Sequence, residues 1–170
     1  MTGFYVSQND IIEVSAFLDN MDVHQYDDET LKAAKTAMIL IDWVNEIPIM
    51  EISQKYDIGA GDLEGKVSSA DWLSFALSRL SQKFKRDKMH DFEILNLRIK
   101  EGIGSEIIPL VAIPGIGRVR ARRLYNSGLK SLSQISETSV SRISSIPGFS
   151  TKLAETTISG ARRLIKSGLA

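Results

Sequence analysis

The sequence contains no cysteine, which excludes disulfide bonds, thiolate zinc sites and cysteine nucleophiles. Its only histidines, His24 and His90, stand alone, so the spacing of an imidazole metal site is missing and we expect no metal. No apolar run approaches the roughly 20 residues that a membrane-spanning helix needs, and the first residues do not resemble a secretion signal. We therefore expect a soluble, cytoplasmic protein without a membrane partner.

Motifs for nucleotide chemistry are also missing. The sequence has no Gly-x-x-x-x-Gly-Lys-Ser/Thr loop, which would cradle nucleotide phosphates, so we expect no cofactor in this chain. The acidic residues form no cluster with a neighbouring base or metal pattern, and charged helix faces explain them. An independent enzyme such as a nuclease or glycosylase is therefore not favoured.

The net charge of zero conceals a strong asymmetry. Residues 1–117 hold 11 Lys/Arg and 19 Asp/Glu, whereas residues 118–170 hold 10 Lys/Arg and 2 Asp/Glu, or net charges of about −8 and +8. A basic end joined to an acidic one indicates contact with nucleic acid. Docking of the basic end on an acidic protein surface is the alternative interpretation.

All long segments have helical periodicity, and none alternates as a strand. We expect an all-α protein with a helical bundle in residues 1–104 and a small helical domain in residues 105–170. The longest predicted helix runs from its N-cap Asp62 to about Phe84. The periodicity predicts that its core-facing stripe consists of Leu63, Val67, Ala70, Leu73, Leu77, Leu80 and Phe84.

A second line along this helix has unusual contents. Small residues surround Trp72, and the cations Arg79 and Lys83 follow it one or more turns later. A flat ring that can stack on a base, with cations near the backbone, suits a single strand. The alternative is that Trp72 widens the core. The basic run from Lys83 to Lys88 that ends this helix is most simply a solvated helix end, with a DNA contact as its alternative.

The most informative motif begins at Ile113-Pro114-Gly115-Ile116-Gly117 and continues into an arginine-rich helix. An apolar residue, then Gly-apolar-Gly, then a small residue at Ala121 is the pattern of a helix-hairpin-helix. Glycines let the backbone turn tightly and approach a phosphate, and the N-terminus of the second helix presents its N–H groups to that anion. Such a hairpin binds the DNA backbone with little sequence preference. Four arginines favour DNA over protein as the ligand: Arg118, Arg120, Arg122 and Arg123.

The hairpin pattern recurs 33 residues later as Ile146-Pro147-Gly148-Phe149-Ser150. Ser150 replaces the second glycine, and no arginine cluster follows it directly. We therefore interpret the second hairpin as mainly a structural partner of the first. Weaker phosphate contacts are predicted from its helix at Lys152, Arg162, Arg163 and Lys166.

With these motifs the sequence resembles the archaeal Hjm/HelQ-type DNA helicases of superfamily two. The similarity covers the chain from about residue 30 to the end. Its matching stretches are residues 42–46 (DWVNE), 55–58 (KYDI), 61–63 (GDL), 70–73 (ADWL), 97–102 (LRIKEG) and 114–125 (PGIGRVRARRLY).

The resemblance implies a helical bundle whose long ratchet helix lies across the DNA channel, followed by a helix-loop-helix domain. In that family the motor moves 3′–5′ on single-stranded DNA and acts on forked structures at stalled replication forks. Trp72 then matches a base-stacking tryptophan, and the four arginines match those that grip the exiting strand. One departure is Gly65, which stands where relatives carry a strand-contacting arginine, with Lys66 the nearest cation.

The expected function is thus the DNA-binding C-terminal part of an ATP-dependent helicase in DNA repair and recombination, without its motor. ATP and magnesium would belong to the presumed full-length protein, and the partners would be single-stranded or forked DNA and the motor domains. The chain itself is expected to be a monomer. A protein-interaction or autoinhibitory module is the alternative function, and the sequence leaves open whether the chain is a fragment or a stand-alone protein.

Overall fold

A computed structural model describes residues 3–168, and all regular secondary structure in this range is helical, with no strand. It confirms the predicted all-α class. The chain divides into two compact units, residues 1–100 and 101–170, each described here by itself. The helices of the first unit are α1 (Ile11–Asp19), α2 (Asp28–Val44), α3 (Ile49–Tyr56), α4 (Ala60–Phe84) and α5 (Met89–Glu101).

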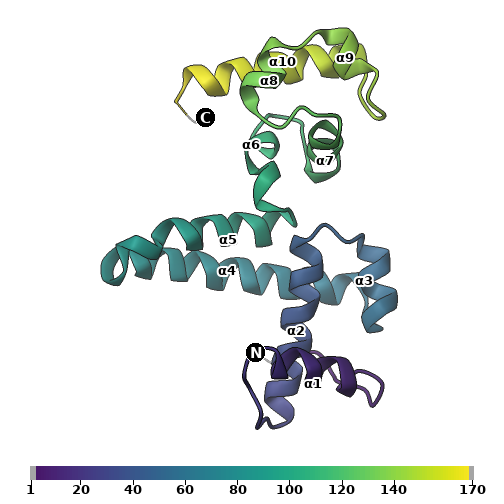
Figure 1. The fold of residues 1–170 in the computed structure, drawn as a ribbon, viewed down its shortest axis with the longest axis vertical. Coiled ribbons are helices and arrows are strands. Elements are labelled where there is room, and N and C mark those ends of the chain that lie inside the picture. Colours follow the sequence, from purple (N-terminus) through teal and green to yellow (C-terminus); the bar gives the residue numbers. More distant parts are fainter. Residues whose placement is uncertain (1–2, 169–170) are drawn as a thin grey trace. The chain divides into compact units, whose positions relative to one another are not determined.

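The first unit is organised around α2, which packs against α1 near its N-terminal end and against α3 near its C-terminal end (Figure 1). One apolar cluster joins α2, α3 and the start of α4 through Ile39, Ile52 and Leu63, and another joins α1 and α2. A buried lysine, Lys35, ties the N-terminal segment to α2 by donating to the Tyr5 carbonyl at 2.9 Å and to Asp10 Oδ2 at 2.8 Å. Burial opposes the charge on Asp10, but hydrogen bonds from Lys35 and Ser7 outweigh it and hold the pKa of this carboxyl below its ordinary value.

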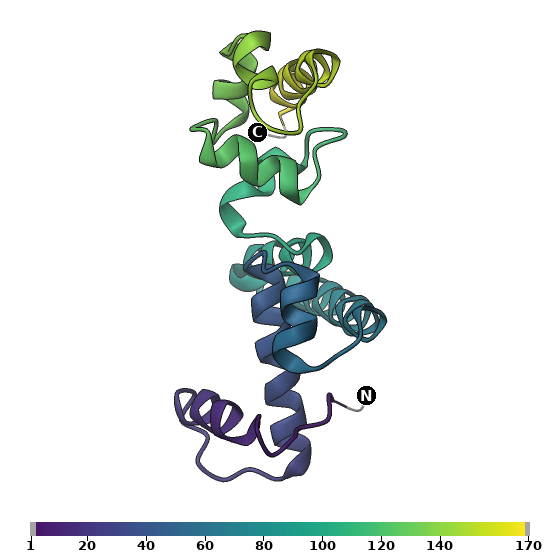
Figure 2. The ribbon, with the colours of Figure 1, turned by 90° about the vertical axis from the view of Figure 1, so that its right-hand side faces the viewer.

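Helices α4 and α5 run side by side, joined by a 3₁₀ turn at Arg86–Lys88 (Figures 1 and 2). The buried line of α4 along this pair consists of serines, because Ser74, Ser78 and Ser81 are small and satisfy their hydroxyls on carbonyl oxygens of their own helix at 2.7–2.8 Å. Asn96 of α5 donates to the Asp71 carboxylate at 2.7 Å and to the Ser74 hydroxyl at 3.0 Å. Polar contacts therefore hold this pair together.

The predicted core stripe of α4 is wrong beyond its first turns. Leu63 is buried, but the four large apolar residues of the C-terminal half are exposed: Leu73, Leu77, Leu80 and Phe84. The helical period of α4 was predicted correctly, but the buried face was not. The side of α4 that faces α5 is the line of serines. The helix also begins earlier than predicted, with Gly59 as N-cap, while Asp62 sits three residues inside and accepts from the Gly59 amide at 3.2 Å.

The second unit is a tandem of two hairpins around one core. After a 3₁₀ turn at Ser105–Ile107 its helices are α6 (Ile108–Val111), α7 (Arg118–Asn126), α8 (Leu132–Glu137), α9 (Val140–Ser144) and α10 (Thr151–Lys166). The two small residues predicted at helix crossings, Ala121 and Ala154, are fully buried. At Gly160 of α10 a Cβ would lie 2.9 Å from the Ile113 side chain, so the absence of a side chain at Gly160 lets α10 pack closely against the first hairpin.

Core packing behind α7 should dominate the stability of this unit. Leu124 is completely buried in that core, so Leu124→Ala should lower the free energy of unfolding by about 2–5 kcal/mol. The matched control is Val119→Ala on the exposed side of the same helix, which should change it by less than about 0.5 kcal/mol. Urea denaturation followed by circular dichroism measures both, and equal midpoints for the two variants would contradict this packing.

Candidate nucleic-acid interface

The turn of the first hairpin presents the N-terminus of α7. Ile113 and Ile116 are buried on either side of the turn, and the Ile116 amide donates to the Ile113 carbonyl at 3.0 Å. Gly115 between them has φ +81°, a conformation that only glycine adopts without strain. Gly117 is the N-cap residue, and no side chain caps the helix. The first turn of α7 therefore offers backbone N–H groups and the positive end of the helix dipole to an anion.

The second hairpin has the same turn but a different end. Ile146 and Phe149 are buried, and Gly148 has φ +86°, as at Gly115. Its N-cap is Ser150, whose hydroxyl accepts from the Leu153 amide at 3.2 Å. The start of α10 is therefore already capped by its own side chain, and only the first hairpin lacks such a cap.

A groove of about 340 Å³ lies where the two hairpin turns meet, lined by Gly117, Arg118, Val119, Arg120, Arg123 and Gly148. Arg120 Nη1 donates to the Gly115 carbonyl at 3.1 Å, which holds this guanidinium over the first turn. Arg123 Nη1 donates to the Pro147 carbonyl at 2.8 Å, so this arginine bridges to the second turn. Two guanidiniums and the uncapped helix end thus border one small basic depression.

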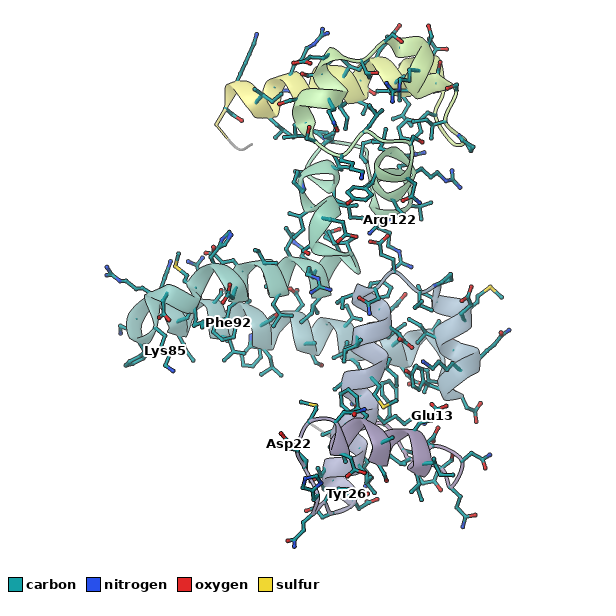
Figure 3. All side chains as sticks on the ribbon, viewed as in Figure 1. Glu13, Asp22, Tyr26, Lys85, Phe92 and Arg122 are labelled. Atoms are coloured by element: carbon teal, nitrogen blue, oxygen red, sulfur yellow. The ribbon has the colours of Figure 1, made fainter. Side chains whose placement is uncertain are left out.

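The remaining predicted residues of this unit are not all gathered there. Arg122, which is labelled in Figure 3, pairs with Glu106. Its guanidinium lies 5.1 Å from the centre of the Tyr125 ring. Arg162 Nε donates to the Ser136 carbonyl at 3.0 Å. Lys152 lies in the first turn of α10, and Arg163 in its last turn, about 16 Å further along the helix. The structure therefore brings Arg118, Arg120 and Arg123 together and leaves Lys152 and Arg163 apart.

The two tryptophans, Trp72 on α4 and Trp43 on α2, lie in different environments. Trp72 is 67% exposed, so it does not fill the core of its unit. Trp43 is half-buried, and its indole N–H donates to the Ile99 carbonyl at 2.7 Å. Lys66, the cation nearest to Gly65, lies over the Phe4 ring at 5.4 Å.

Arg79 and Lys83 are exposed on the side of α4 that carries Trp72. The sequence-based reasoning missed Phe75, which is 48% exposed and has the Arg79 guanidinium 5.1 Å from its ring centre. The signal was present in the sequence, because residues 72, 75 and 79 are spaced by three and four.

Comparison with known proteins gives matches to both units. A family model described as archaeal helicase, domain 4 matches residues 1–102, and one described as a SAM-like helix-hairpin-helix tandem matches residues 107–163. Two similar curated proteins are both named ATP-dependent DNA helicase Hel308. The one from Thermoplasma acidophilum is 47% identical over 148 residues, which cover 87% of this chain and 22% of that protein. The one from Pyrobaculum calidifontis is 37% identical over 158 residues, which cover 92% of this chain and 22% of that protein. The chain thus spans about a fifth of the length of these relatives.

Tryptophan fluorescence should report the two environments directly. We expect Trp72→Phe to remove most of the emission that acrylamide quenches and to shift the remaining emission to shorter wavelength, because Trp72 is the solvent-exposed indole. The converse variant, Trp43→Phe, should leave a readily quenched, long-wavelength emission. Similar quenching constants in the two variants would contradict the exposure of Trp72.

Proposed function

This chain belongs to the archaeal helicase, domain 4 family, and from that premise we propose that it supplies DNA-binding surfaces of an ATP-dependent 3′–5′ DNA helicase acting on single-stranded or forked DNA in replication-fork repair. The observation that carries the proposal is the uncapped start of α7 beside Arg120 and Arg123. Backbone N–H groups and guanidiniums are the donors that proteins direct at phosphates. This arrangement would bind a strand through its backbone and with little regard to base sequence.

Each of the two units would make a different contact with the strand. In the first, the exposed Trp72 on α4 would stack on a base while nearby cations attract the backbone. In the second, the first hairpin would clamp phosphates of the same strand as it leaves. Weaker phosphate contacts would come from Lys152, Arg162 and Arg163, while the pairing of Arg122 with Glu106 argues for a smaller share for that residue.

Nucleotide chemistry is proposed to lie in motor domains outside these residues. The relatives are named as ATP-dependent helicases, which implies ATP and with it magnesium. The residues here do not fit that role, because the sequence has no phosphate-binding loop and residues 3–168 contain no group of three His, Asp or Glu side chains placed to hold a metal ion. No helix in the described part of the chain is both long and apolar enough to cross a bilayer.

Loss of the guanidiniums at the groove should weaken binding in a salt-dependent way. We expect Arg120→Ala/Arg123→Ala to lower the affinity for a labelled single strand by about tenfold or more and to flatten the plot of log affinity against log salt by about 0.7 per lost contact. Fluorescence anisotropy at several salt concentrations measures both quantities. The charge-matched control Lys130→Ala/Arg142→Ala removes two cations of the same unit that lie outside the groove. Equal losses in the two variants would count against the groove, and no binding by the unaltered chain would favour the protein-interaction alternative.

Capping the first hairpin should separate backbone binding from general charge. An added Cβ at Gly117 meets nothing within 4 Å, so Gly117→Asp should fold normally and cap α7 with its own carboxylate. That carboxylate would occupy the N–H groups and repel phosphate, so we expect at least a tenfold loss of affinity with melting temperature unchanged or slightly raised. Ser150→Asp places the same charge on a turn that is already capped, so we expect it to lower the affinity much less. Equal affinities in the two variants would rule out a special role for the start of α7.

A further inference from the structure

Helix α4 carries a second exposed ring beside Trp72. Phe75 follows one helical turn later, and at 100° per residue positions 72, 75 and 79 fall within about 60° of one another around the helix. The Arg79 guanidinium lies over the Phe75 ring, 5.1 Å from its centre, and 48% of Phe75 remains exposed. Two aromatic rings and a cation thus share one side of a rigid helix.

The same side of α4 leads to a basic groove at the end of the helix pair, near Lys85 in Figure 3. This groove has a volume of about 610 Å³ and is lined by Arg79, Gln82, Lys83, Arg86 and Met89. Among the described residues no carboxylate pairs with any of its three cations, whereas the neighbouring Lys88 pairs with Asp91 at 3.2 Å. The groove therefore has a net positive lining that a phosphate would neutralise.

Another side of α4 carries residues that suit a different kind of ligand. Its exposed stripe of Leu73, Leu77, Leu80 and Phe84 is apolar, which suits packing against protein. The side with Trp72 and Phe75 instead carries two rings followed by the guanidinium of Arg79 and the ammonium group of Lys83. Rings that accept bases and cations that accept the backbone form the combination that single-stranded nucleic acid requires.

We propose that Phe75, held under Arg79, is a second base-stacking platform next to Trp72, and that the groove of Arg79, Lys83 and Arg86 binds the phosphates that follow. The site would hold a short run of single strand along α4 rather than a single base, since residues 72 and 83 are on the order of 16 Å apart along the axis. This inference rests on the proposed function of Trp72 and extends it to a residue and a groove that it does not include.

Two alanine variants on one helix test the platform. Phe75→Ala should lower the affinity of the 170-residue chain for an oligo-dT strand by roughly fivefold to a hundredfold. The dependence on salt should not change, because no charge is lost. Leu77→Ala is the matched control, since Leu77 is 44% exposed against 48% for Phe75 but lies on the apolar stripe, and we expect its affinity to stay within about twofold of the unaltered chain. Phe75→Tyr keeps the ring and should bind as the unaltered chain does.

The groove has a separate signature. Lys83→Ala/Arg86→Ala should weaken binding and also flatten the salt dependence by about 0.7 per lost contact, unlike Phe75→Ala. A blunt duplex should be insensitive to Phe75→Ala because its bases are already stacked. If the unaltered chain binds oligo-dT and Trp72→Ala weakens it while Phe75→Ala matches Leu77→Ala, this inference is wrong and the proposed function stands. If the unaltered chain binds no oligonucleotide at all, both fail.

Discussion

The interface on the second unit depends on how two buried isoleucines hold a backbone turn. Ile113 and Ile116 are anchored in the core that α10 completes, and the chain between them can turn only because Gly115 takes a positive φ. That anchoring fixes the direction in which α7 begins. An uncapped helix end is unfavourable to bury, because its free N–H groups would then lack the water or ligand that satisfies them. The fold thus places its strongest anion-attracting feature at the surface and supports it with rigid packing.

The second hairpin explains why one copy is enough for this purpose. Both turns have a buried apolar pair and a glycine with positive φ, so both are anchored in the core. They differ in the N-cap, where Gly117 leaves α7 open and the hydroxyl of Ser150 closes α10. Arg123 also donates to the Pro147 carbonyl, so a side chain of α7 links the second turn to the groove beside the first. In the proposed function, the second hairpin mainly packs and the first binds phosphate.

Much of this was visible in the sequence. The helical period, the duplicated hairpin and the small residues Ala121 and Ala154 predicted the all-α class and the crossings in the core. The pairing of Arg122 with Glu106 was not predictable, because it joins residues 16 positions apart through tertiary structure. The core stripe of α4 failed for a more general reason. The helical spacing of apolar residues shows that a helix has an apolar face. Which face becomes buried depends on the shape and polarity of the helix that packs against it.

The error on α4 is informative because this helix has three faces, roughly a third of a turn apart. The serine face is buried at little cost, since each hydroxyl donates to a carbonyl of its own helix and so is not left unsatisfied. Using small residues there leaves the bulky ones, Trp72 and Phe75 on one face and Leu77 and its neighbours on the other, to project outward. The hydrogen bonds from Asn96 to Asp71 and Ser74 join α5 to this part of α4. A helix packed through its polar face can therefore present an aromatic, cationic surface and an aliphatic one independently.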